Sequence, residues 1–190
     1  PVNPQLIEMV NHYMQAGHNQ YAPMPGHPKL RAAIATKTEV CSGWEPDVDA
    51  DITVTCGAIE AIHSTIAALI GHGDEVIIME PAYDAYEPII NLHGGAAVGV
   101  PLRAKDYSID WELVWDAINE QTKMIIINSP HNPSGAILSQ DDLKSLESII
   151  DETGIFLLSD EVYEHIVFDG TEHYSVLRSQ RLRKNAIVIS

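Results

Sequence analysis

"GIFLLSDEVYEHIVFDG", residues 154–170, is the stretch that decides the fold. Residues 155–158 are apolar at every position, and a strand without alternation is typical of one covered on both faces. The apolar run stops at Ser159, and two carboxylates, Asp160 and Glu161, follow at once. Because burying an unpaired charge is costly, the end of this strand calls for a positive partner.

Apolar runs of similar length recur along the chain, and helical patterns lie between most of them. The predicted strands are residues 52–55, 75–79, 97–102, 124–128, 155–159 and 186–189. The predicted helices are residues 4–16, 29–38, 58–70, 111–118 and 140–152. Strands that alternate with helices form a largely parallel sheet. The sequence therefore predicts an α/β protein with three layers, α/β/α, around a mostly parallel central sheet.

Capping residues support two of these helices. Ser139, with Asp142 three residues later, has the pattern of a capping box, and Gly154 is suited to end the same helix. Ser108 or Asp110 is expected to cap the helix at residues 111–118.

The composition excludes several classes of protein. A net charge of −16 argues against binding to nucleic acid or an anionic membrane surface, because both require basic patches. No apolar run approaches the roughly 20 residues that span a bilayer. Cys41 and Cys56 are too few for a disulfide framework and are typical of a reducing, cytoplasmic setting. The histidines lack metal-ligand spacing, so no metal site is predicted.

Unusual residues follow four of the predicted strands. Ligands of open α/β sheets bind at the carboxyl ends of the strands, so these residues are expected to converge on one rim. They are Gly57, Ala58 and Ile59 after the first strand, Tyr83 after the second, Asn132 after the fourth, and Asp160 and Tyr163 after the fifth.

Each of these residues has an ordinary structural explanation: a tight turn for Gly57, loop chemistry for Asn132, a helix cap for Asp160, and packing for the tyrosines. Together, however, they suit one ligand. Backbone N–H groups at a helix start bind phosphate, a tyrosine ring stacks on a planar ring, and an amide and a hydroxyl donate to a phenolate-like oxygen. An acid keeps a ring nitrogen protonated. Pyridoxal phosphate carries all four features.

The chain resembles the fold type I pyridoxal-phosphate-dependent aminotransferases of class I/II, in the methionine/aromatic (kynurenine-type) branch. The resemblance rests on "NQYAPMPGHPKLR" (19–31), "VTCGAIEAI" (54–62), "MEPAYDAYEP" (79–88), "NSPHNPSG" (128–135) and "LSDEVYEHIVF" (158–168). It implies transfer of an amino group from an amino acid to a 2-oxo acid. It also implies a homodimer with shared active sites.

The resemblance assigns a role to each residue of the rim. It implies that Gly57, Ala58 and Ile59 hold the phosphate and that Tyr83 stacks on the cofactor ring. It further implies that Asn132 and Tyr163 contact the phenolic oxygen, that Asp160 binds the ring nitrogen, and that Tyr21 reaches the phosphate of the partner subunit.

One family feature is not found in the sequence. The family lysine that forms the Schiff base follows the strand at residues 186–189, so it is expected just beyond Ser190, and none of the six lysines is expected at the site. We therefore expect a fragment that is inactive alone. Residues 1–50 would form an N-terminal helical and linker part and residues 51–190 an incomplete cofactor-binding large domain, with the small domain largely missing.

Two other functions remain open. A carbon–sulfur lyase of the same fold would use the same cofactor-binding residues, and a non-catalytic domain of this fold would serve only in binding or dimerisation. A dinucleotide-binding protein is disfavoured, because "GHGDEV" at residues 71–76 precedes a strand where the glycine fingerprint should follow one.

Overall fold

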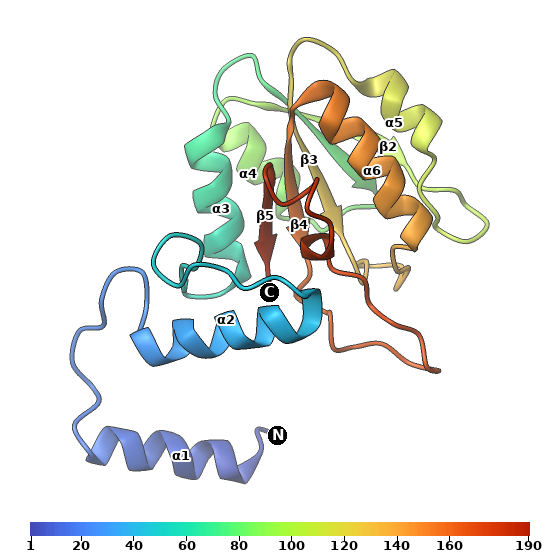
Figure 1. The fold of residues 1–190 in the computed structure, drawn as a ribbon. Helices are drawn as coiled ribbons and strands as arrows, with labels where there is room; N and C mark the ends of the chain where they lie inside the picture. The colour runs from blue at the N-terminus through green and yellow to red at the C-terminus, as the bar shows by residue number, and fades with distance from the viewer.

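The computed structural model describes residues 1–190 and has five strands in one parallel sheet (Figure 1). The strand order is β2-β1-β3-β4-β5. The strands are β1 (Glu75–Glu80), β2 (Ala96–Pro101), β3 (Thr122–Asn128), β4 (Phe156–Asp160) and β5 (Ala186–Ile189). All four strand pairs are parallel, which confirms the α/β prediction.

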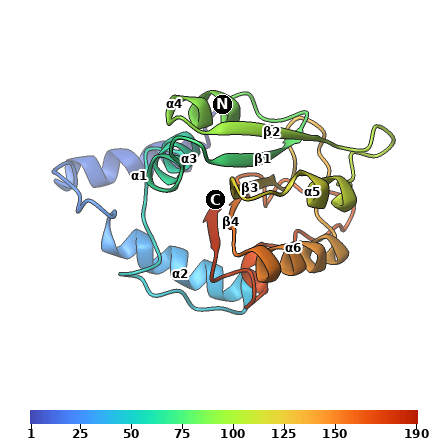
Figure 2. The same ribbon diagram turned by 90° about the horizontal axis from the view of Figure 1, so that it is seen from above.

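The chain has six α-helices, four of which cover the two faces of the sheet (Figure 2). They are α1 (Pro4–Gln15), α2 (Pro28–Ser42), α3 (Ala58–Leu69), α4 (Tyr86–Leu92), α5 (Trp111–Ala117) and α6 (Gln140–Thr153). A short 3-10 helix, Val176–Arg178, precedes β5. Figure 2 shows α3 and α4 on one side of the sheet and α5 and α6 on the other. The three layers are those that the sequence predicts.

The core is split by the sheet into two clusters, and β1 contributes alternate residues to each. Ile77 and Met79 pack with residues of α5 and α6, whereas Val76 and Ile78 pack with residues of α3 and α4. The residues 76–79 are all buried. An apolar side chain is therefore required at every position of this strand, which explains why its sequence does not alternate.

Local signals set several helix boundaries as predicted. Ser139 and Asp142 form the capping box of α6, and Gly154 ends it in the left-handed conformation. Of the two candidate caps for α5, Asp110 accepts from the Glu112 N–H. Helix α2 runs four residues beyond its predicted end and stops at Gly43, whose φ is 72°.

Two predictions of secondary structure are wrong. Residues 52–55 form no strand, because no strand of the sheet lies beside them; the Val54 N–H donates instead to the Pro25 carbonyl. Helix α4 is absent from the sequence prediction. It is only seven residues long and contains Pro88, which is tolerated because it falls in the first turn, where no N–H has an intrahelical partner.

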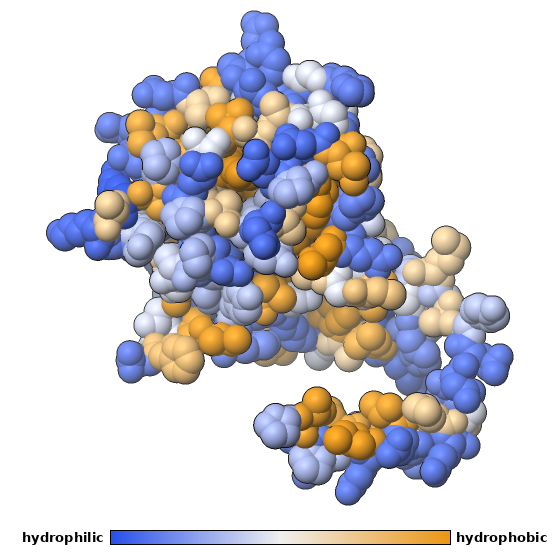
Figure 3. All heavy atoms as spheres, turned by 180° about the vertical axis from the view of Figure 1, so that it is seen from behind, coloured by the Kyte–Doolittle hydropathy of each residue, from blue (hydrophilic) through white to orange (hydrophobic).

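Helix α1 lies away from the rest of the molecule and has no buried residue. Figure 3 shows α1 separated from the main body, with hydrophobic residues gathered on the side that faces it. Its exposed apolar side chains are Leu6, Ile7, Met9, Val10, Tyr13 and Met14. None of the helices combines the length and the apolar character needed to cross a membrane.

Candidate active site

Asp160 is a buried carboxylate at the carboxyl end of β4, and it has no cationic partner. It is 4% exposed, and no lysine, arginine or histidine forms an ion pair with it. Its side chain accepts from the Tyr86 hydroxyl at 2.7 Å and from the Val162 N–H at 3.2 Å. Both donors are neutral, so the carboxylate is hydrogen-bonded but its charge is not balanced.

Two tyrosines of the α4 region lie next to this carboxylate. Tyr86 is 3% exposed, and its pKa is raised by burial and further by the charge of Asp160. The half-buried ring of Tyr83 meets the Tyr86 ring edge to face at a centroid distance of 5.6 Å. Tyr163 is half-buried in the turn that follows β4. Tyr83 and Asp160 are thus linked through Tyr86, a residue that sequence reasoning does not single out.

A second buried polar residue, Asn128, connects the loop after β3 to β4. Asn128 faces Asp160 in the sheet register, and its Nδ2 donates to the Asp160 carbonyl at 2.9 Å. Its Oδ1 accepts from the Asn132 N–H at 2.6 Å. The peptide bond between Asn132 and Pro133 is cis. Asn128 therefore fixes the backbone of Asn132 relative to Asp160.

The start of α3 offers unpaired backbone donors. Gly57 has a φ of 106° and a ψ of 168°, a conformation that is essentially restricted to glycine. The N–H groups of Gly57, Ala58 and Ile59 donate to no acceptor in the chain, and the Glu60 carboxylate accepts from the preceding N–H, that of Cys56. Figure 1 shows this end of α3 on the same side as the carboxyl ends of β4 and β5. Unpaired donors at a helix start attract an anion.

Glu161 is a second buried acid and lies directly after Asp160. It is 2% exposed, and burial raises its pKa. Its side chain accepts from the Ser159 hydroxyl at 2.9 Å and from the Val176 N–H at 3.0 Å. Because Val176 lies 15 residues further along the chain, this carboxylate anchors the far end of the segment that carries Tyr163.

One lysine lies nearer to this edge than the sequence suggests. Lys37 of α2 forms an ion pair with Glu164 and donates to the Ser190 hydroxyl at 2.9 Å, just after β5. Burial raises the pKa of Glu164, but the hydrogen bonds from Lys37 and Ser190 outweigh burial and lower it overall.

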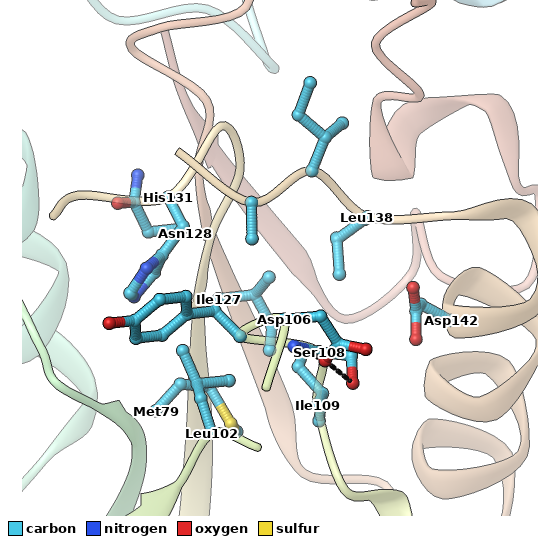
Figure 4. Close-up of a pocket in the computed structure, with 13 residues that line it drawn as sticks. Met79, Leu102, Asp106, Ser108, Ile109, Ile127, Asn128, His131, Leu138 and Asp142 are labelled. Atoms are coloured by element: carbon cyan, nitrogen blue, oxygen red, sulfur yellow. Dashed lines mark hydrogen bonds between the residues drawn. The ribbon is translucent and has the colours of Figure 1, made fainter. Parts of the chain in front are cut away.

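A separate cavity of about 250 Å³ lies on the α5–α6 side of the sheet (Figure 4). Its lining is mostly apolar and includes Met79, Leu102 and Ile127. Asn128 and His131 form the part of its wall that is shared with the loop after β3. Burial lowers the pKa of His131.

The structure thus groups most of the predicted site residues. Asp160, Tyr83 and Asn132 are linked through Tyr86 and Asn128, and Tyr163 follows on the next turn. Tyr21 is not brought to this edge; it lies fully exposed in the loop between α1 and α2. No group of three or more histidine, cysteine or acidic side chains is arranged to hold a metal ion. The roles assigned to the individual residues stay predictions.

Comparison with known proteins agrees with this geometry. The family model "Aminotransferase class I and II" matches residues 3–189. A methionine aminotransferase of Escherichia coli (strain K12) is 45% identical over 185 residues, which are 97% of this chain and 48% of that protein. Human kynurenine–oxoglutarate transaminase 3 is 34% identical over 181 residues, which are 90% of this chain and 40% of that protein.

Solved structures show the same relationship. A crystal structure of an Escherichia coli protein with methionine aminotransferase function superposes with a TM-score of 0.95 at 45% identity, and covers 98% of this chain and 49% of that one. The chain spans about half the length of the curated relatives it matches. Since the family model extends over nearly the whole sequence, this chain belongs to the aminotransferase class I and II family.

Proposed function

We propose that this protein is a pyridoxal-phosphate-dependent aminotransferase that moves an amino group from an amino acid, of methionine or aromatic type, to a 2-oxo acid. The observation that carries the proposal is the buried, unbalanced carboxylate of Asp160 on the same side of the molecule as the free N–H groups at the start of α3 (Figure 1). A site with one buried negative charge and one anion-binding helix start suits a ligand that has a cationic end and a phosphate.

The residues present fit this cofactor. Asp160 would hold a proton at the ring nitrogen, because an adjacent anion favours the charged form of a base. The N–H groups of Gly57, Ala58 and Ile59 would hold the phosphate, and Gly57 leaves open space at its own Cβ position. Tyr83 would lie against the ring. When bound, the cofactor supplies an electron sink for the substrate.

Asn132 and Tyr163 would orient the other side of the ring by donating to its phenolic oxygen. The bond from the Asn132 N–H to Asn128 supports this role, because it fixes the loop backbone and leaves the Asn132 amide free to donate. The ion pair between Lys37 and Glu164 holds the residue next to Tyr163 against α2. Together these contacts would hold the ring in one orientation, which lowers the entropy cost of reaching a reactive geometry.

We also propose a homodimer in which a second copy covers α1 and the Tyr21 loop. Six apolar side chains of α1 are exposed, and Tyr21 is fully exposed as well. Exposed apolar patches of this kind are typical of interaction surfaces. Light scattering should give twice the mass of one chain, and Leu6→Glu combined with Val10→Glu should shift it to the mass of one chain. A monomer before substitution would contradict the dimer.

Cys41 and Cys56 are both free and exposed, which supports a reducing, cytoplasmic location. Cell fractionation checks this location, and recovery in a membrane or extracellular fraction would contradict it.

Amino transfer is tested on the protein expressed from the complete open reading frame. Methionine, phenylalanine and kynurenine serve as donors and 2-oxo acids as acceptors, and both products are quantified. The proposal expects the donor to be converted only when a 2-oxo acid is present. Release of pyruvate and a thiol from a cysteine thioether, without need for a 2-oxo acid, would identify a lyase instead.

A further inference from the structure

We propose that Tyr86 is a positioning residue, whose hydroxyl holds the Asp160 carboxylate ready to receive the ring nitrogen of the cofactor. The inference rests on the proposed function and concerns the same site. Tyr86 donates to Asp160 Oδ2 at 2.7 Å, and the two residues are 3% and 4% exposed. The bond is therefore shielded from water, where a hydrogen bond to a charged group is strongest.

The tyrosine is itself held in place. It is the first residue of α4 and belongs to the apolar cluster that includes Ile62 and Ile66 of α3 and Leu158 of β4. The edge-to-face contact with Tyr83 restrains it further. A hydroxyl on a ring fixed in this way has little freedom except to point at its acceptor, so the carboxylate is held in one orientation.

The hydrogen bonds leave capacity for the cofactor. An ionised carboxylate offers about four lone-pair sites, and only the Tyr86 hydroxyl and the Val162 N–H occupy sites here. A third donor, such as a protonated ring nitrogen, can bind without displacing either.

Tyr86→Phe removes only the hydroxyl and retains the ring. Binding of pyridoxal phosphate to the 190-residue chain is compared with binding of its deaza analogue, in which carbon replaces the ring nitrogen. The variant should bind pyridoxal phosphate about tenfold more weakly, as expected for the loss of a hydrogen bond to a charged group. For the deaza analogue, the affinities of the variant and of the unsubstituted chain should agree within about twofold, because the analogue has no ring nitrogen for Asp160 to contact. Tyr107→Phe removes an exposed hydroxyl from the cavity on the α5–α6 side and leaves both hydrogen bonds to the Asp160 side chain intact, so it should change neither affinity.

A double-mutant cycle completes the test. In an Asp160→Asn background, Tyr86→Phe should have no further effect on the affinity for pyridoxal phosphate, because the hydroxyl acts only through the carboxylate. Without cofactor, a slowly exchanging phenolic proton should be visible by NMR in the unsubstituted chain and lost in both Tyr86→Phe and Asp160→Asn.

The outcomes separate this inference from the proposed function. If the unsubstituted chain does not bind pyridoxal phosphate, the inference is refuted, while amino transfer by the protein from the complete open reading frame tests the proposed function separately. If the chain binds pyridoxal phosphate, and Tyr86→Phe weakens the binding of pyridoxal phosphate and of its deaza analogue equally, or weakens neither, the positioning role is refuted while the cofactor site stands.

Discussion

Gly57 offers the sharpest test of the anion site at the start of α3. Its φ of 106° and ψ of 168° lie in a region that other residues avoid, and a Cβ placed there would meet nothing within 4 Å. Gly57→Ala therefore introduces backbone strain without a steric clash. Such strain costs on the order of 1–3 kcal/mol. For a domain of this size, that corresponds to a fall in Tm of roughly 2–12 °C.

The strain should also disturb binding. A backbone that relaxes to a more favourable φ turns the peptide groups at the helix start, so the N–H groups of Gly57 and Ala58 leave their positions. Losing one such hydrogen bond to the phosphate should lower the affinity for pyridoxal phosphate by about 10- to 100-fold. Pyridoxal, which lacks the phosphate, should bind equally well to both proteins.

Gly154→Ala is the matched control. Gly154 also has a positive φ, 70°, and open space at its Cβ position, but it ends α6 at the opposite end of the sheet. Gly154→Ala should lower the free energy of unfolding by about 1–2 kcal/mol and leave the affinities for pyridoxal phosphate and pyridoxal unchanged. Urea unfolding and fluorescence titration measure the two effects. If Gly57→Ala lowers the affinity for pyridoxal as much as the affinity for pyridoxal phosphate, or lowers neither affinity, the phosphate assignment is wrong.

Three further predictions concern the buried residues around the site. Burial raises the pKa of Glu161 above its ordinary value of 4.5, so its folded form binds the proton more tightly and its contribution to stability falls as the pH rises from about 4.5 through the folded pKa. Glu161→Gln should remove this fall in stability. If urea unfolding between pH 4 and 8 gives the same dependence of the unfolding free energy on pH for both proteins, the prediction is contradicted. Asn128→Asp replaces the donor to the Asp160 carbonyl by an acceptor and should lower stability by about 2–4 kcal/mol, with an unchanged unfolding midpoint as the opposing result. Leu146→Ala empties a fully buried position of α6 and should cost about 2–5 kcal/mol without changing the affinity for pyridoxal phosphate; a change in that affinity would show that the core and the site are coupled.

The central strands of the sheet could be predicted because burial on both faces leaves a clear pattern in the sequence. Residues 124–128 and 155–159 are apolar nearly throughout, and both became strands within two residues of the predicted bounds. Residues 52–55 are all β-branched, which is also typical of strands, but they form no strand. Strand formation requires a neighbour with free N–H and carbonyl groups, and the presence of that neighbour is a property of the whole chain.

Much of the candidate site could also be predicted, because residues after parallel strands must meet at one edge. The partners of those residues could not. Tyr86 lies 74 residues from Asp160, and Asn128 lies 32 residues from it. Each looks like an ordinary helix or strand residue until the fold brings the pair together. The position of Lys37 near this edge could not be predicted for the same reason, because a lysine on a helix gives no indication of where that helix packs.

The affinity of the chain for pyridoxal phosphate, measured with and without Asp160→Asn, tests the central claim most directly. The substitution keeps the shape of the side chain and removes its charge. If the buried carboxylate binds a protonated ring nitrogen, the affinity should fall roughly 100-fold or more, the cost of leaving a buried charge without its partner. The deaza analogue should bind both proteins alike. Equal affinity of the two proteins for pyridoxal phosphate itself would contradict the account.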